Sequence, residues 1–196
     1  GPAPAGDTSS ATPGCSATAA PDNSDRMLDP LIFAELEAMS GEQINCDLFA
    51  DKHNAQVPRF FTKEDDCFTK AWTHMACWAN PPFTNECIVA TFKRAELAWR
   101  KAPDTTSFLI ICPVWPGCSW APTVCPSSAI FERIHRFEAG TRLFTAPSKT
   151  PGGGRTPLPP TRWAVDVFHL AASPRVVTSL SDDVLAHMRL CHVGGA

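Results

Sequence analysis

The chain has 196 residues, 44% of them hydrophobic, so we expect one folded domain with a substantial core and flanking tails. Its formal net charge is −3 and its pI is about 6.1, which excludes a basic field over the whole molecule. Any contact with nucleic acid would have to come from a local patch or from a neighbouring partner. No apolar run approaches the roughly 20 residues that span a bilayer, and no signal peptide is recognisable at the N-terminus.

The nine cysteines are an odd number, and several fall inside predicted strands or helices, where cysteine acts as a small hydrophobic residue. We therefore expect reduced thiols and an intracellular protein, nuclear if the source is eukaryotic. Cys112, Cys118 and Cys125 lack the short paired spacing of zinc sites, so no metal is expected.

Three regions follow one another along the chain. Residues 1–24 are rich in Ala, Pro, Thr and Ser and predict a disordered tail. Residues 25–172 carry the alternating elements of one domain, and 173–196 predict a C-terminal helix, starting at Ser181, with a tail. The first helix of the domain is predicted over 28–39, with Asp29 as N-cap, Pro30 in the first turn and Gly41 as the stop signal.

Apolar strands and helices alternate through the rest of the domain, which predicts an α/β sheet. The expected strands are residues 44–49, 57–62, 75–79, 107–113, 143–146 at an edge, and 163–170. A helix is expected over 85–101 and helical turns within 64–72 and 128–133. Loops are expected over the aromatic segment 115–120 and the Pro- and Gly-rich segment 149–161.

The sequence Asn80-Pro81-Pro82-Phe83, here the Asn80 turn, follows the predicted strand 75–79. Two prolines fix two φ angles and remove two backbone donors, which leaves the Asn80 side-chain oxygen and the Pro81 carbonyl as acceptors. An exocyclic amine that must keep its lone pair free for attack on a methyl donor needs such acceptors. Phe83 would offer a stacking face to a base outside its helix. An ordinary tight turn after a buried strand is the other interpretation.

Ligands of α/β sheets lie beyond the carboxyl ends of the strands. Asp47-Leu48-Phe49-Ala50-Asp51, here the Asp47 corner, also falls at a strand end, so we expect it beside the Asn80 turn. The densest group of basic residues, here the basic cluster, is the candidate for contact with phosphates and consists of Arg133, His135, Arg136 and Arg142.

The order of these features resembles the bacteriophage-type DNA adenine-N6 methyltransferases. The similar parts are an Asp-Pro helix start, Asp-Leu-Phe-Ala at 47–50 with a following Asn54, Arg-Phe-Phe-Thr at 59–62, Trp72, Trp-Ala-Asn-Pro-Pro-Phe at 78–83 and a strand ending at Pro113. The sequence is more similar still to the methyltransferase-like domain of DIRS-type tyrosine-recombinase retroelements. The additional similar segments are Asn-Ala-Gln-Val-Pro at 54–58 and Pro-Val-Trp-Pro at 113–116. The resemblance covers about residues 28–170.

This resemblance implies a Rossmann-like sheet that uses S-adenosylmethionine, with helices on both faces. It assigns Asn80, Pro81, Pro82 and Phe83 to catalysis. It assigns the Asp47 corner (Asp47, Leu48, Phe49, Ala50 and Asp51) to the donor, and Asp66, or its neighbour Asp65, to the donor's adenine amine. The chain departs from the pattern in lacking a glycine-rich donor loop. Copies of the retroelement domain often lose the turn's Asn, whereas this chain keeps Asn80.

Two functions of different classes follow. The first is an S-adenosylmethionine-dependent N-methyltransferase acting on adenine in DNA, with RNA, cytosine-N4 or a protein glutamine amide as other acceptors. The second is a catalytically inactive module of the same fold that binds nucleic acid or a protein. Because the chain is acidic, a protein partner or fused polyprotein neighbours would supply part of the DNA affinity. No membrane partner is expected.

Overall fold

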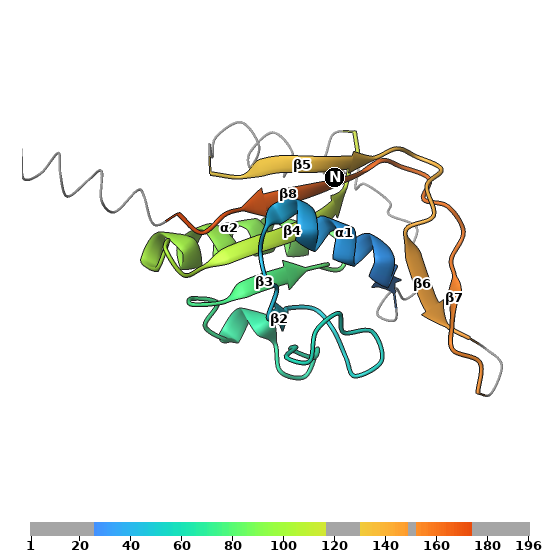
Figure 1. Ribbon diagram of the computed structural model, residues 1–196, viewed down its shortest axis with the longest axis horizontal. Coiled ribbons are helices and arrows are strands. Elements are labelled where there is room, and N and C mark those ends of the chain that lie inside the picture. Colours follow the sequence, from blue (N-terminus) through green and yellow to red (C-terminus); the bar gives the residue numbers. More distant parts are fainter. Residues whose placement is uncertain (1–25, 117–129, 149–151, 174–196) are drawn as a thin grey trace, which may run out of the picture.

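The computed structural model describes residues 26–116, 130–148 and 152–173 (Figure 1). These residues form a mixed α/β structure with two sheets, two α-helices and one short 3-10 helix. The predicted N-terminal tail, the helix predicted over 181–190 and most of the aromatic loop over 115–120 lie outside the described residues.

The main sheet has five strands in the order β2-β3-β4-β8-β5. They are β2 (Cys46–Asp47), β3 (Ala76–Ala79), β4 (Ser107–Pro113), β8 (Val165–Leu170) and β5 (Glu132–Phe137). β2, β3 and β4 run parallel, and β8 is antiparallel to both of its neighbours. All seven residues of β4 are buried, as its continuous apolar run predicts for a central strand.

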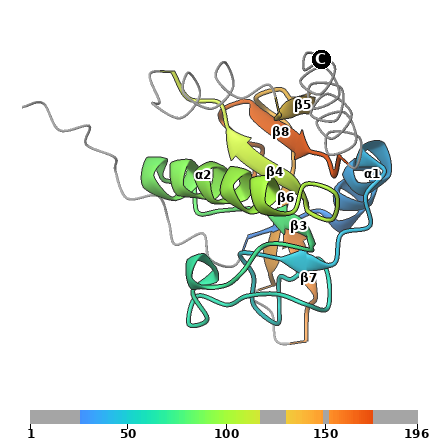
Figure 2. The same ribbon diagram turned by 90° about the vertical axis from the view of Figure 1, so that its left-hand side faces the viewer.

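A helix covers each face of the main sheet, and Figure 2 shows the two helices on opposite sides of it. On one face α1 (Pro30–Ser40) places Phe33 edge-on to Trp78, with ring centroids 5.3 Å apart. On the other face α2 (Asn85–Lys101) packs Phe92 against Phe168 at 5.5 Å. Side chains alternate between the faces of β4, so its buried residues serve both cores.

The predicted cap and stop residues of the first helix are confirmed, although α1 starts at Pro30 and not at residue 28. The Asp29 carboxylate accepts a hydrogen bond from the Leu31 N–H at 2.9 Å, which caps α1. Gly41 ends the same helix in the left-handed region, at φ 71°, where a residue without Cβ is favoured. Thr84 caps α2 by accepting from the Cys87 N–H at 3.3 Å.

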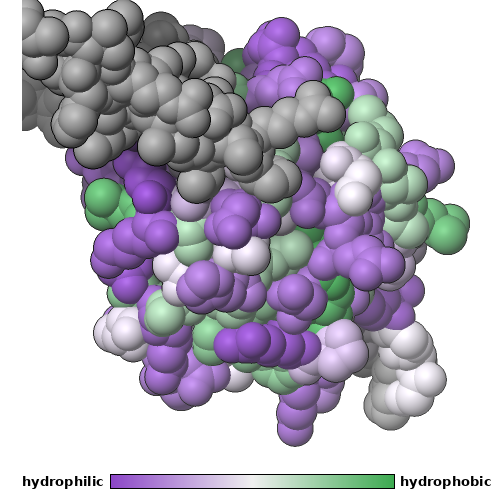
Figure 3. Space-filling view, turned by 60° about the vertical axis from the view of Figure 1, so that its left-hand side comes forward, coloured by the Kyte–Doolittle hydropathy of each residue, from purple (hydrophilic) through white to green (hydrophobic). Residues whose placement is uncertain are grey.

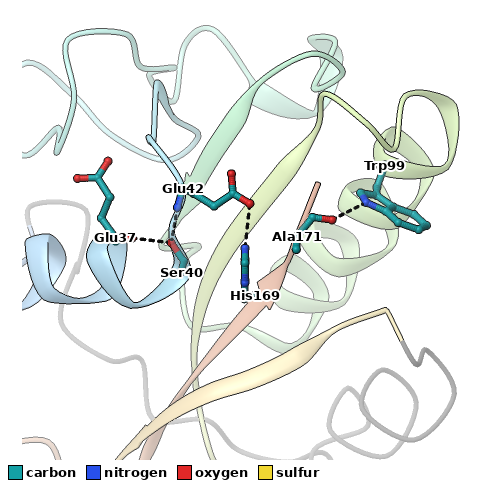
Figure 4. Close-up of polar contacts among 6 residues, drawn as sticks. All are labelled: Glu37, Ser40, Glu42, Trp99, His169 and Ala171. Atoms are coloured by element: carbon teal, nitrogen blue, oxygen red, sulfur yellow. Dashed lines mark hydrogen bonds and ion pairs between the residues drawn. The ribbon is translucent and has the colours of Figure 1, made fainter. Parts of the chain in front are cut away.

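Side chains tie both helices to the end of β8 (Figure 4). His169 of β8 lies 3.1 Å from Glu42, which follows α1, and the two residues point toward each other. From the opposite face, the Trp99 indole of α2 donates to the Ala171 carbonyl at 2.9 Å. The antiparallel strand is thereby held between the two layers of helix.

A second, small sheet packs beside the main one and has the order β1-β6-β7. Its strands are β1 (Met27–Leu28), β6 (Phe144–Pro147) and β7 (Arg155–Pro157), all antiparallel to their neighbours. The strand predicted over 143–146 is therefore central in a sheet and not at an edge. Part of the loop predicted over 149–161 is a strand, because pairing with β6 organises Arg155–Pro157.

Two further sequence predictions are wrong. The helical turn predicted over 128–133 ends in the strand β5, which pairs with β8 from a distant part of the chain. The strand predicted over 57–62 is reduced to a single parallel bridge between Phe60 and Asp47. The helical turn within 64–72 is confirmed as η1 (Cys67–Thr69).

The surface shown in Figure 3 is mainly hydrophilic, and its hydrophobic residues form small separate patches. The large hydrophobic side chains that are exposed in the described part are Leu31, Met39 and Leu97. Single exposed residues of this kind are normal for a folded domain. Neither described helix is long and apolar enough to cross a bilayer.

Candidate active site

The carboxyl ends of β2 and β3 bring the Asp47 corner and the Asn80 turn together. The two strands are adjacent and parallel, with Asp47 paired to Trp78. The ladder continues past the strand end, where the Leu48 N–H donates to the Trp78 carbonyl at 2.9 Å. Asn80 lies two residues beyond Trp78, so the two predicted site segments leave the same edge of the sheet side by side.

The Asn80 turn joins β3 directly to α2, which fixes it at both ends. Asn80 is half-buried, Pro81 is buried and Pro82 is exposed. The Pro82 carbonyl accepts from the Thr84 N–H at 2.7 Å, at the start of the helix. Within the described part of the chain, no hydrogen bond engages the Asn80 side chain or the Pro81 carbonyl. Both predicted acceptors are therefore uncommitted.

Phe83 of the Asn80 turn is the first of three aromatic side chains in contact, here the aromatic wall, which continues with Trp115 and Trp163. Phe83 meets Trp115 edge-on with ring centroids 6.3 Å apart, and Trp115 meets Trp163 at 5.5 Å. All three are half-buried. Phe144 of the small sheet also meets Phe83 edge-on, with ring centroids 6.1 Å apart.

The aromatic wall is assembled from three parts of the chain. Trp115 and Trp163 flank a hydrogen-bonded pair, in which the Val114 N–H donates to the Ala164 carbonyl at 2.8 Å. The Trp163 indole nitrogen is the one buried side-chain polar atom without a hydrogen-bond partner among the described residues. Sequence reasoning missed Trp163 as a site residue; its signal was a tryptophan at the start of the strand predicted over 163–170.

Asp47 is a buried carboxyl group, 2% exposed. Burial raises its pKa to about 6, against the opposing effect of hydrogen bonds from two backbone N–H groups. These come from Gln56 at 3.1 Å and Phe49 at 3.2 Å, one to each carboxylate oxygen. Each oxygen keeps acceptor capacity for one more donor. Asp47 therefore shapes the loop that follows it and places a carboxylate at the strand end.

The remainder of the Asp47 corner is held by short-range hydrogen bonds. The Asp51 carboxylate accepts from the His53 N–H at 2.6 Å, and the Asn54 side chain accepts from the Asp51 N–H at 2.7 Å. Leu48 and Ala50 are buried beneath this turn. The Asp47 corner is thus a defined turn without glycine.

Phe49 connects the Asp47 corner to the segment that carries Asp65 and Asp66. Its ring lies edge-on to Phe68 at 5.8 Å, and both rings are half-buried. The Asp66 carboxylate caps η1 by accepting from the Phe68 N–H at 3.2 Å. Asp65 accepts from the N–H and the hydroxyl of Thr62. Asp66 is therefore close to an aromatic pair beside the Asp47 corner.

Three of the four residues of the basic cluster are not at the Asn80 turn. Arg133, His135 and Arg136 belong to β5, and two strands separate β5 from β3. Arg136 makes two bonds to the buried Asp166, at 2.6 and 2.7 Å, and Arg133 lies 3.7 Å from the same carboxylate. His135 packs on Phe137, and the exposed Arg142 reaches the Leu158 carbonyl at 3.4 Å. Arg136 is thus committed to an ion pair.

Comparisons with known proteins bear on the same segments. A model of the DNA N-6-adenine-methyltransferase (Dam) family matches residues 19–114. The chain is also 33% identical over 54 residues to the DNA N-6-adenine-methyltransferase of Haemophilus phage HP1 (strain HP1c1). That alignment covers 28% of this chain and 31% of the phage protein, so the chain spans about a third of its curated relative.

The family match contains the Asp47 corner, Asp66, the Asn80 turn and Trp78, and it ends just after β4. β5 to β8, Trp115 and Trp163 lie beyond it. The resemblance to the retroelement domain stays a prediction. Over residues 19–114, which carry both segments of the candidate site, the chain is similar in sequence to the phage-type DNA N-6-adenine-methyltransferase (Dam) family.

Proposed function

We propose that this protein is an S-adenosylmethionine-dependent N-methyltransferase that acts on the exocyclic amine of adenine in DNA. The observation that carries the proposal is the Asn80 turn, whose two acceptor oxygens are uncommitted in the described structure and lie beside the Asp47 corner. The similarity of residues 19–114 to the Dam family supports the same reaction. The match to the phage enzyme supports DNA as the substrate.

We assign the donor to the Asp47 corner in a Rossmann-like sheet. Three parallel strands with a helix on each face favour ligand binding at their carboxyl ends. The described residues fit this donor. The carboxylates of Asp47 and Asp51 complement its positive charges, and Phe49 with Phe68 and Asp66 suits its adenine. Leu48 and Ala50 form the apolar base. When bound, S-adenosylmethionine supplies a methyl group already activated by its sulfonium charge.

The protein's own contribution is to hold the amine. The Asn80 side-chain oxygen and the Pro81 carbonyl accept the two N–H groups of the target amine, which keeps its nitrogen lone pair directed toward the Asp47 corner. Pro81 and Pro82 make the turn rigid, so the acceptors need no reorganisation. Phe83 and the rest of the aromatic wall stack on the base and exclude water. Positioning therefore accounts for most of the expected acceleration.

The direct test is Asn80→Ala, assayed by mass spectrometry of digested DNA after incubation with the donor. We expect the rate constant at saturating substrate to fall about 100- to 1,000-fold, because one preorganised acceptor is lost. Asn45→Ala is the matched control. Asn45 caps the opposite end of the sheet by accepting from the Ala76 N–H at 3.2 Å, and its loss should leave the rate within about twofold. Activity of Asn80→Ala within twofold of wild type would refute the assignment.

A second function is a non-catalytic module of the same fold that binds nucleic acid or a protein. The observation that favours it is that Asp47, Asp51 and Asp66 already accept hydrogen bonds within the chain. Calorimetry with S-adenosylmethionine and its demethylated product separates the two, since only the enzyme requires micromolar binding. Digestion and mass spectrometry of DNA, RNA and protein from the same incubation distinguish adenine from cytosine-N4 and glutamine acceptors.

A further inference from the structure

The loop over residues 47–61 carries the Asp47 corner and begins and ends on the main sheet. The Asp47 N–H donates to the Arg59 carbonyl and the Phe61 N–H donates back to the Asp47 carbonyl, both at 2.9 Å. The Ala50 N–H adds a bond to the Phe61 carbonyl at 3.1 Å. The base of the loop is therefore closed by backbone hydrogen bonds.

The far part of this loop is tied to the small sheet by two side chains. The Gln56 amide donates to the Leu28 carbonyl of β1 at 2.7 Å. Arg155 of β7 donates to the His53 carbonyl at 3.0 Å. The same guanidinium donates to the hydroxyl and the carbonyl of Thr145 in β6, both at 2.9 Å. One arginine thus joins β7, β6 and the loop.

Gln56 links this tie to the acidic group itself. Its side chain is held by β1, and its backbone N–H donates to the Asp47 carboxylate. A shift of Gln56 away from β1 would therefore move a donor that orients Asp47. The loop 47–61 contains no glycine, so the backbone cannot close on a ligand as a glycine-rich loop does. Its shape must come from such contacts.

From these contacts we propose that the small sheet is a brace for the donor site, with Arg155 and Gln56 as positioning residues for donor binding. The inference rests on the proposed function, because it needs the Asp47 corner to hold the donor. It goes beyond the family match, since Thr145 and Arg155 lie outside residues 19–114. A planar guanidinium suits three acceptors at fixed angles, whereas a lysine ammonium would satisfy them less well.

The test measures binding of S-adenosylhomocysteine by calorimetry, which needs no turnover. Arg155→Met keeps side-chain length but removes every donor, and we expect its Kd to rise about tenfold. Gln56→Met should raise the Kd about threefold or more. Arg100→Met is the matched control, because Arg100 pairs with Glu96 on the exposed face of α2, and its Kd should stay within twofold of wild type.

Steady-state kinetics separate a positioning role from general damage. In Arg155→Met we expect the KM for the donor to rise with the Kd, while kcat at saturating donor and the KM for DNA stay within about twofold. A lowered melting temperature with an unchanged donor Kd would overturn the inference, because the tie would then be structural only. If Arg155→Met does not fold, Arg155→Lys takes its place, with an expected rise in Kd of about threefold.

The two proposals fail in different ways. Wild-type protein that binds neither S-adenosylmethionine nor its product overturns the proposed function, and this inference with it. Wild-type protein that binds the product with the same Kd as both Arg155→Met and Gln56→Met overturns the inference alone.

Discussion

At the scale of single residues, Asp47 couples the stability of the fold to pH. Burial raises its pKa to about 6, so the folded protein binds this proton more tightly than the unfolded chain does. The resulting stabilisation is complete below the unfolded pKa near 4 and is lost as the pH rises through about 6. We compare the free energy of unfolding of the wild type with that of Asp47→Asn. The difference, wild type minus variant, should be roughly 2 kcal/mol larger at pH 4.5 than at pH 7.5.

Urea unfolding of both proteins at the two pH values measures this difference. The exposed Asp104→Asn controls for the loss of a carboxyl group. A difference that is constant with pH, or that grows with rising pH, would contradict the assignment of the raised pKa to Asp47.

The two arginines that face Asp166 should respond very differently to truncation. Arg136 makes two short bonds to a carboxylate that is 7% exposed, whereas Arg133 is half exposed and 3.7 Å away. Arg136→Ala leaves a buried charge with little compensation, and we expect a loss of about 2 kcal/mol in the free energy of unfolding. Arg133→Ala should cost less than about 1 kcal/mol. Chemical denaturation measures both losses. If the two variants lose the same free energy of unfolding, the ion pair with Asp166 is not what stabilises the fold at Arg136.

At the scale of elements, the start of α2 sets the geometry of the Asn80 turn. Thr84 caps the helix immediately after Phe83, and the Thr84 N–H also binds the Pro82 carbonyl. Thr84→Ala should lower the free energy of unfolding by about 1 kcal/mol, because the Cys87 N–H loses its acceptor. Thr84→Ser keeps the hydroxyl and should retain most of that stability. An equal loss in both variants, measured by thermal unfolding, would argue against capping.

At the scale of the whole molecule, a net charge of −3 means that the proposed binding to DNA would depend on a few local cations. Arg133 and Arg142 are exposed arginines of the basic cluster, and neither makes the two short bonds to Asp166 that engage Arg136. Replacing either by Ala should weaken binding to duplex DNA of any sequence and reduce the slope of log K against log salt by about 1. Fluorescence anisotropy over a salt series measures the slope. If the slope is unchanged in both variants, neither arginine contacts a DNA phosphate.

The sequence by itself predicted the parts of this fold that local chemistry controls. The Asp29 cap of α1, the glycine that ends α1 and the buried run of β4 depend on side chains within a few residues of one another. It was also predictable that the Asp47 corner and the Asn80 turn lie next to each other, because parallel strands bring their carboxyl ends to one edge of the sheet.

Only the tertiary structure decided the remainder. β5 becomes a strand through pairing with β8, about 30 residues further along the chain, and the three-residue β7 does so through pairing with β6. The strand of β6 was predicted, but its central place between β1 and β7 was not. The aromatic wall depends on the antiparallel approach of β8 to β4, which sets Trp163 beside Trp115. The tie from Arg155 to His53 joins residues 102 positions apart. Contacts at such separations leave no periodic signal in a sequence, because what selects them is the burial and hydrogen bonding of the folded chain.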